Sequence, residues 1–240
     1  KVAYLLHPEG ILRAQQWEEV FLRDFDRAIR YFQGKLAWEE PKITISNDWE
    51  IQKAVIARMT QAGKPVAYDV ETELKGPIDS RTRCIAIANE DEALVVPIRS
   101  VTGAPLHPPG SLSAMESFRP LLDFLVKPPV PLTGHNAGQF DRTHMLWAWG
   151  ADVTVSADTM ILHLLTNNEL PHNLGFVGSH HTDFTEAWKA DHTATQAGDD
   201  LELHTYCGKD AVVTARVVSP LIRGVKTRSQ THLVKREMML

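Results

Sequence analysis

The sequence has 240 residues, a formal net charge of −5 and 43% hydrophobic residues. This length and composition predict one large domain, or one domain with an appendage, with enough apolar residues for a core. The negative charge disfavours a protein that holds nucleic acid by bulk electrostatics. No apolar run is long enough to span a bilayer and no signal peptide is recognisable, so we expect a cytoplasmic protein with no membrane partner.

The cysteines and histidines do not suggest a zinc protein. Cys84 and Cys207 are far apart and neither belongs to a Cys-x-x-Cys pair, so neither a disulfide framework nor a zinc site is predicted, and a reducing compartment fits. The histidines in or beside predicted helices lack His-x-x-x-His spacing: His163, His172, His180, His181, His192 and His204. We expect His180 and His181 to be solvated, with contact to substrate phosphates as the alternative.

The first segment predicts an amphipathic helix. Apolar residues recur there with helical spacing and form a stripe that must pack on something: Trp17, Val20, Phe21, Phe25, Ala28, Ile29 and Phe32. Residues 34–41 read as a linker, because Gly34 and Pro41 interrupt the pattern. The first residue is Lys1 and not Met, which suggests a trimmed or excised piece.

A strand, a helix and three more strands are predicted next. Residues 42–46 read as a strand, and Asn47 with Glu50 has the spacing of a capping box that opens a helix ending near Gly63. Apolar strands follow at residues 66–73, 83–89 and 93–99. The last two are joined by a short acidic turn, so the three strands are expected to form an antiparallel meander.

Strands and helices alternate in the second half. Ser113 with Glu116 is another capping-box pattern, and its helix ends before Pro128. A strand at residues 131–133 and helices at 139–149 and 157–166 follow. Such alternation is typical of parallel α/β construction. A meander followed by αβα units is the layout of the ribonuclease H-like fold, so we expect an α/β protein with a mixed sheet.

Two carboxylates lie close together in the first strand of the meander. Side chains alternate along a strand, so Asp69 and Glu71 project from the same side, about 7 Å apart. Such charges repel each other unless a cation lies between them, and hard oxygen ligands suit Mg²⁺ or Mn²⁺. A strand that runs into a solvated acidic turn would show the same pattern.

Two later stretches carry residues suited to the same chemistry. Asp141 falls in the first turn of a helix that follows a strand, where the helix dipole tolerates an acid. Tyr206 and Asp210 are four residues apart, so they share one face of the last helix and can point into one cleft. Each pattern is common on its own.

Together, the order and separation of these stretches are specific. They resemble the exonuclease motifs of the DEDD superfamily in its tyrosine subclass, as found in the proofreading domain of phage and bacterial family A DNA polymerases. The three motifs are Asp69-x-Glu71-Thr72, Asn136-x-x-x-Phe140-Asp141 and Tyr206-x-x-x-Asp210. The likeness covers residues 43–220 and includes the stretch 156–182 between the second and third motifs. Asn136 and Asp141 are one residue further apart than in some relatives.

The resemblance implies phosphodiester hydrolysis with two Mg²⁺ or Mn²⁺ ions. It implies that Asp69 bridges both ions, that Glu71 and Asp210 complete the site of one ion, and that Asp141 holds the other. Tyr206 would orient the attacking water, because a phenol with its ordinary pKa near 10 is not a strong base at neutral pH. The resemblance further implies contacts with the terminal nucleotide from Thr72, Leu74, Asn136 and Phe140.

A second resemblance concerns the first segment. His7-Pro8, then Leu12-Arg13 and a helix, is similar to the closing segment of bacterial-type uracil-DNA glycosylases. The implied organisation is a glycosylase-like remnant at 1–33, a linker at 34–41, an exonuclease domain at 42–220 and a helix at 221–240. That helix would lead toward a polymerase domain of the same parent chain. A phage origin, and hence the host cytoplasm, fits such a fusion.

The expected function is therefore the removal of nucleotides from single-stranded 3′ ends of DNA, as a proofreading module without polymerase activity in these residues. An RNA-trimming exoribonuclease of the same subclass shares the motifs. A catalytically idle scaffold that binds single strands is the non-enzymatic alternative, and the intact set of acids with Tyr206 counts against it. Lys75, Arg81 and Arg83 follow the first motif and are candidates for contacts with the nucleic-acid backbone, or for a solvated face.

Overall fold

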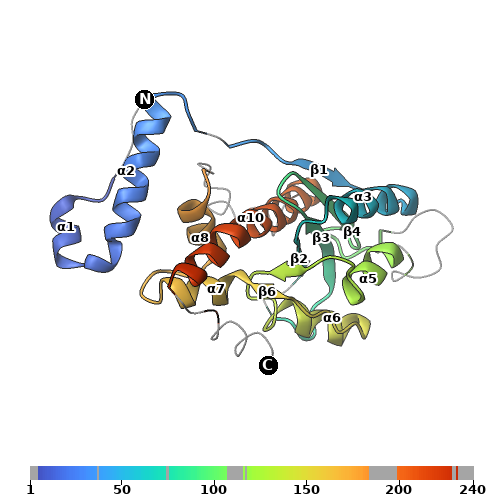
Figure 1. Ribbon diagram of the computed structural model, residues 1–240. Helices are drawn as coiled ribbons and strands as arrows, with labels where there is room; N and C mark the ends of the chain where they lie inside the picture. Colours follow the sequence, from blue (N-terminus) through green and yellow to red (C-terminus); the bar gives the residue numbers. More distant parts are fainter. Residues whose placement is uncertain are drawn as a thin grey trace.

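A six-stranded mixed sheet with the strand order β1-β4-β3-β2-β5-β6 forms the centre of the protein (Figure 1). The structure is a computed structural model that describes residues 5–36, 38–73, 76–106, 116, 118–183, 199–228 and 231. Its strands are β1 (Lys42–Ile45), β2 (Val66–Thr72), β3 (Thr82–Ala88), β4 (Glu92–Pro97), β5 (Leu132–Gly134) and β6 (Ala157–Asp158). The helices of the described residues are α1 (Pro8–Arg13), α2 (Glu18–Phe32), α3 (Trp49–Ala62), α5 (Arg119–Val126), α6 (Asp141–Trp149), α7 (Thr159–Thr166), α8 (Leu174–His181) and α10 (Asp200–Thr227), with a 3-10 turn at Gln15–Trp17. Among these helices, none is both long and apolar enough to cross a membrane.

The pairing of the strands confirms the predicted meander. β2 runs antiparallel to β3, and β3 runs antiparallel to β4. Parallel pairs then extend the sheet on both sides, with β1 beside β4, β5 beside β2, and β6 beside β5. The sheet is therefore mixed, as expected for a meander followed by αβα units.

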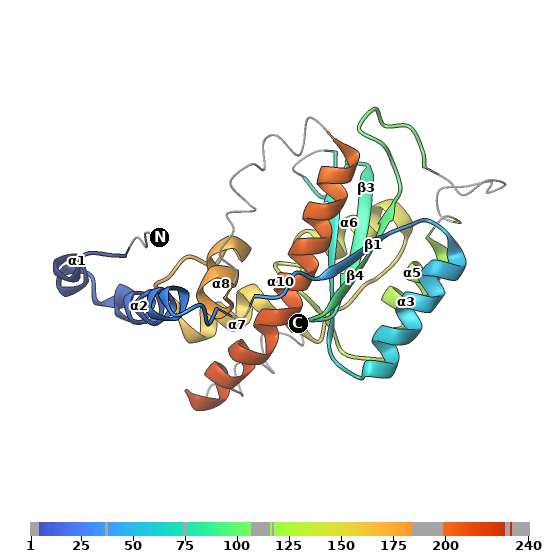
Figure 2. The same cartoon turned by 90° about the horizontal axis from the view of Figure 1, so that it is seen from above.

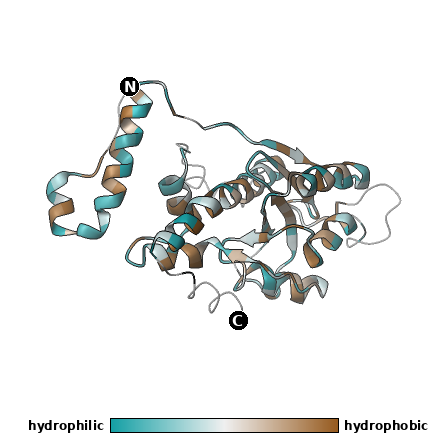
Figure 3. Ribbon diagram, in the orientation of Figure 1, coloured by the Kyte–Doolittle hydropathy of each residue, from teal (hydrophilic) through white to brown (hydrophobic). Residues whose placement is uncertain are grey.

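β2 divides the interior into two sides. Val66, Tyr68 and Val70 point into the larger core, which the sheet forms with α3, α5 and α6. Asp69 and Glu71 alternate with them and so face the other side, which α10 crosses (Figure 2). Hydrophobic residues fill the sheet and the helix faces packed on it (Figure 3). The acidic pair thus lies where the sheet meets α10.

Close packing brings α10 near the sheet. A Cβ on Gly208 would lie 3.0 Å from Cγ2 of Ile43 and 3.1 Å from Cγ2 of Val95. The sheet side chains opposite this helix include several alanines and Cys84. A residue larger than glycine at position 208 would push the helix outward, and Gly208 lies between Tyr206 and Asp210.

Three helices begin at other residues than the sequence predicts. The helix predicted at 139–149 begins at Asp141, since residues 137–140 form a turn. Asp48, and not Asn47, caps α3, because its carboxylate accepts from the amides of Glu50 at 2.8 Å and Ile51 at 3.2 Å. The Asn47 amide donates instead to the carbonyl of Leu106. Likewise, the helix predicted at 157–166 begins at Thr159, since the two preceding residues pair with β5 as β6. Ser113 of the second predicted capping box lies outside the described residues.

The last helix extends past residue 220, where the predicted exonuclease domain ends. α10 runs unbroken from Asp200 to Thr227 and contains Pro220. A proline lacks one backbone donor, yet the helix continues for two further turns here. Residues 221–227 of the helix predicted at 221–240 therefore belong to α10, and residues 229, 230 and 232–240 lie outside the described part.

The amino-terminal helices lie to one side of the sheet and join β1 through an extended segment (Figure 1). α2 contacts the end of α8 through its arginines. Arg27 donates to the carbonyls of Ser179 and Thr182, and Arg30 forms an ion pair with Asp183. These bonds occupy carbonyls at a helix end, where basic groups are favourable.

The prediction that the apolar stripe of α2 packs on another element is wrong for most of its length. The exposed fractions of Phe25, Ile29 and Phe32 are 49%, 44% and 54%, and only Val20 of this helix is buried. The arginine face, on the opposite side of the helix, makes the contacts with α8. The hydrogen bonds of the arginines, and not contacts of the apolar stripe, therefore orient α2.

Candidate active site

Three acidic residues converge between β2 and α10. Asp69, Glu71 and Asp210 each offer a carboxylate oxygen, and these oxygens all lie within 4.8 Å of one another. Asp69 and Glu71 come from one face of β2, and Asp210 is buried on the face of α10 that packs against it. Unbalanced carboxylates at this separation repel one another strongly in a partly buried site.

A fourth acid shares this site. Asp141 is the first residue of α6 and is only 6% exposed. Its pKa is raised well above the ordinary value, first because the carboxyl is buried, and then because Asp69 and Glu71 place negative charge nearby. The amide of Val70 on β2 partly offsets this shift. Asp141 thus lies close enough to β2 for the charges of Asp69 and Glu71 and the amide of Val70 to act on its carboxyl.

Tyr206 lies beside the acids on α10. Its hydroxyl is hydrogen-bonded to Asp210, one turn further along the helix. Burial raises the pKa of Tyr206 above its ordinary value, and the nearby Asp210, Glu71 and Asp69 raise it further. The phenol therefore remains protonated at neutral pH. It can donate and accept hydrogen bonds but does not act as a base.

The two cysteines lie behind the site as buried free thiols. The Cys207 thiol donates to the carbonyl of Asp69 at 3.8 Å, which ties α10 to β2 next to the acids. Burial raises the pKa of both thiols. Protonated, inaccessible thiols are poor nucleophiles, so these residues serve packing.

The loop between β5 and α6 carries two more predicted residues. Asn136 has a left-handed backbone with φ 59°, and its buried Oδ1 has no hydrogen-bond partner among the residues that the structure describes. Phe140 is half-buried and directly precedes Asp141. Thr72 ends β2, just after a register shift that follows Glu71. Leu74 and Lys75 lie outside the described residues.

The sequence did not reveal one residue that binds this loop from another strand. Asp158 ends β6 and is 4% exposed, and its carboxylate accepts from the amides of Asn136 at 3.0 Å and Ala137 at 2.8 Å. An acid at the end of a strand and just before a helix is a signal that could have singled it out, but its contact with a loop about twenty residues earlier depends on the fold.

Some residues that were predicted to contact the substrate contact other parts of the protein instead. Arg83 is buried and pairs with Asp200 at 2.8 Å, so it is neither solvated nor available to a nucleic-acid backbone. Arg81 is exposed and pairs with Glu73 at 3.2 Å. The expectation that His180 and His181 are solvated is also wrong, because both rings pack among other histidines beneath α2.

Comparisons with known proteins concern the family and the fold of this chain. Residues 44–225 match the family model described as 3′-5′ exonuclease. The catalytic core of RRP6 from Trypanosoma brucei has a TM-score of 0.62 at 18% identity, with 85% of this chain and 52% of that chain covered. NrnC from Brucella melitensis bound to pGG has a TM-score of 0.60 at 17% identity, with 83% and 89% covered. No curated protein sequence matches this chain.

RNase D from Escherichia coli, described as an exoribonuclease involved in structured RNA processing, has a TM-score of 0.54 at 12% identity. The alignment covers 83% of this chain and 51% of that one, so this chain spans about half the length of the RNase D and RRP6 chains. At these identities the likeness concerns the fold. It confirms the predicted ribonuclease H-like architecture with its mixed sheet.

Proposed function

Because this chain belongs to the family of 3′-5′ exonuclease domains, we propose that it removes nucleotides from single-stranded 3′ ends of DNA. The observation that carries the proposal is the convergence of Asp69, Glu71 and Asp210 within 4.8 Å, with Asp141 electrostatically coupled to the first two. A binding scaffold would not require four mutually repelling acids in one partly buried place. Such an arrangement is typical of a catalytic centre.

The acids fit divalent metal ions. Their donor atoms are carboxylate oxygens, which suit Mg²⁺ and Mn²⁺, and their mutual repulsion is relieved by a cation. Asp69, Glu71 and Asp210 would hold one ion, and Asp141 with Asp69 would hold a second. Bound ions would neutralise charge on the scissile phosphate and lower the pKa of water.

Tyr206 would orient the attacking water. Its proton is engaged with Asp210, so the lone pairs of the phenol oxygen remain to accept a hydrogen bond from water. Asn136 and Phe140 lie on the loop that leads to Asp141, and Thr72 follows Glu71 on β2. We propose that these three residues contact the terminal nucleotide, with the buried Oδ1 of Asn136 as a hydrogen-bond acceptor. Leu74 is proposed only from the motif likeness.

Replacing Tyr206 by phenylalanine tests this role. Tyr206→Phe keeps the ring but removes the hydroxyl, so we expect a loss of roughly tenfold to a hundredfold in kcat with little change in the Mn²⁺ affinity. Calorimetry of Mn²⁺ binding and single-turnover cleavage measure the two quantities. If Mn²⁺ affinity falls more than kcat does, Tyr206 supports the acids and does not position water.

The substrate preference is tested with 5′-labelled oligonucleotides in Mg²⁺ or Mn²⁺. Single-stranded DNA is expected to be shortened from its 3′ end faster than a blunt duplex, because the end must be unpaired and splayed before it can enter the site, which costs stacking energy. Gel analysis of the products gives the direction and the rate. Equal rates on both substrates would contradict the requirement for unpaired nucleotides.

A second candidate function is the trimming of RNA. The likeness to RNase D, an exoribonuclease by its description, favours it. An enzyme that prefers RNA has to recognise the 2′-hydroxyl, whereas one that prefers DNA has to exclude it or ignore it. The same assay with a matched RNA oligonucleotide decides between the two, and a preference of tenfold or more for RNA would replace DNA as the proposed substrate.

A further inference from the structure

We propose that Asp158 and Thr159 are positioning residues of the active site, which hold the β5–α6 loop in the shape that delivers Asn136 and Asp141. The inference rests on the proposed function for its catalytic consequence, but the contacts themselves are structural. Neither residue belongs to the three motifs. Both lie at the junction of β6 and α7 (Figure 1).

Asp158 binds two segments of the chain at once. Its Oδ1 accepts from the amide of Asn136 at 3.0 Å and from the amide of Met160 at 2.9 Å, while its Oδ2 accepts from the amide of Ala137 at 2.8 Å. A more distant amide, that of Ile161, lies 3.4 Å from Oδ1. The carboxylate therefore caps α7 and also anchors the loop before α6.

Thr159 fixes the same loop through its hydroxyl. It donates to the carbonyl of Gly134 at 3.1 Å and also lies 2.8 Å from Nδ1 of His135. A hydroxyl has one proton, so with that proton directed at Gly134 it accepts from His135, which requires the proton of the neutral imidazole to be on Nδ1. Thr159 thus contacts both Gly134 and His135, the two residues that precede Asn136.

The loop needs such an anchor because its backbone is unusual. Asn136 has a φ of 59°, and a Cβ on Gly134 would overlap the Cβ of Ala137. The carbonyl of Ala137 in turn accepts from the amide of Arg142 at 2.8 Å in the first turn of α6. A hydrogen-bonded path therefore runs from Asp158 through Ala137 to the turn that begins with Asp141.

Asp48 provides a matched control for the capping role alone. Its carboxylate caps α3 through the amides of Glu50 and Ile51, as Asp158 caps α7, but α3 lies on the side of the sheet away from the acids. Asparagine caps a helix about as well as aspartate, so if Asp158 were only a helix cap, replacing either aspartate by asparagine would change little in the melting temperature and nothing at the active site.

The experiment compares Asp158→Asn with Asp48→Asn in the whole chain. Asp48→Asn is expected to melt close to wild type, because the asparagine oxygen can still cap α3. Asp158→Asn is expected to melt lower, because the second carboxylate oxygen, which accepts from Ala137, is replaced by a donor. Only Asp158→Asn is expected to weaken Mn²⁺ binding by calorimetry, to speed hydrogen exchange at the amides of Asn136 and Ala137, and to lower kcat on the order of tenfold or more with a smaller effect on KM. Equal Mn²⁺ affinity and equal kcat in the two variants would overturn the inference.

A milder pair of variants keeps the test informative if Asp158→Asn does not fold. Thr159→Val removes the hydroxyl and should lower kcat and Mn²⁺ affinity, while Thr159→Ser retains the hydroxyl and should restore both. A serine variant no better than the valine variant would count against the inference. Absence of nuclease activity in the wild type would refute the proposed function instead, and the Mn²⁺ affinities and exchange rates would still decide whether Asp158 and Thr159 position the site.

Discussion

Asp210→Ala is expected to reduce exonuclease activity to background while the protein keeps its fold. Asp210 is 4% exposed, meets Asp69 and Glu71 within 4.8 Å, and is hydrogen-bonded to Tyr206. Its removal would take away one of the proposed metal ligands and the hydrogen-bond partner of Tyr206. It also relieves repulsion among the acids, so the loss of packing is partly offset. Single-turnover cleavage of a 5′-labelled strand in Mg²⁺, with a circular-dichroism spectrum, measures both consequences.

Asp123→Ala is the control for loss of a carboxylate elsewhere. Asp123 lies exposed on α5 in an ion pair with Arg119 at 2.8 Å, so its replacement should leave the rate unchanged. Asp69→Ala should behave like Asp210→Ala, since both acids belong to the same cluster. Wild-type turnover by Asp210→Ala, or by the isosteric Asp210→Asn, would show that the cluster is not the catalytic centre.

Local patterns in the sequence were sufficient to predict most of the site. The period of two along β2 places Asp69 and Glu71 on one face, and the i, i+4 spacing on α10 places Tyr206 beside Asp210, whatever the rest of the fold. The meander was predictable for the same reason, because its strands follow one another with short turns. The motif order then connected these local pieces to one another.

Contacts between distant segments could not be predicted in this way. Arg83 was assigned to the surface, but its partner Asp200 is 117 residues away, and only the packing of α10 on the sheet brings them together. Asp158 was missed as an anchor because nothing in its own neighbourhood indicates the loop that it holds. The approach of α10 at Gly208 likewise depends on Ile43 and Val95 of other strands.

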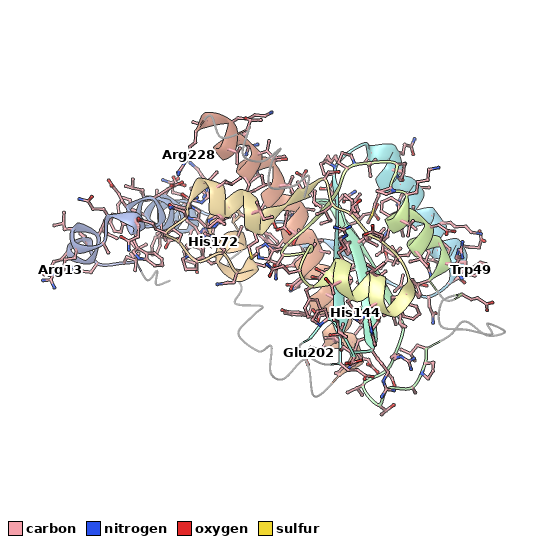
Figure 4. All side chains as sticks on the ribbon, turned by 90° about the horizontal axis from the view of Figure 1, so that it is seen from below. Arg13, Trp49, His144, His172, Glu202 and Arg228 are labelled. Atoms are coloured by element: carbon pink, nitrogen blue, oxygen red, sulfur yellow. The ribbon has the colours of Figure 1, made fainter. Side chains whose placement is uncertain are left out.

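The histidine cluster is a further case, because its burial depends on α2 and α8. We give this name to His163, His172, His180 and His181. His163 lies 2.8 Å from His172 between their Nδ1 atoms, and its ring is 5.6 Å from that of His181 and 6.5 Å from that of His180. His172 lies beside α7 and α8, and Arg228 marks the end of α10 (Figure 4). The rings thus lie among α7, α8, the end of α10 and α2.

Charged groups around the cluster do not compensate for its burial. Glu19 of α2 is 3.7 Å from Nε2 of His180, but Arg23 of α2 and Arg228 of α10 add positive charge. Burial, with a smaller contribution from the neighbouring histidines, lowers the pKa of His163 to about 4 and that of His181 to about 3. Burial also lowers the pKa of His180, although Glu19 opposes the shift.

We therefore expect the metal-free protein to lose stability as the pH falls from 7 to 5. The unfolded chain takes up protons on these histidines below its ordinary pKa of about 6.5, while the folded protein does not, so acid favours unfolding by roughly 2 kcal/mol for each of His163 and His181 in this range. Asp141 acts in the opposite direction, because a carboxyl with a raised pKa in the folded state binds its proton before the unfolded chain does. The destabilising effect of acid through His163, His180 and His181 is expected to exceed its stabilising effect through Asp141.

Thermal melts in EDTA at pH 7, 6 and 5 measure the balance, and two kinds of variant separate its parts. His181→Phe and His181→Gln both remove the titrating group, one with a ring and one without, and each should make the fall in melting temperature with acid shallower. Asp141→Asn removes the opposing carboxyl and should make that fall steeper. If the wild type gains stability between pH 7 and 5, or if both His181 variants follow it in parallel, the buried histidines do not govern the acid response and repulsion among the four acids does.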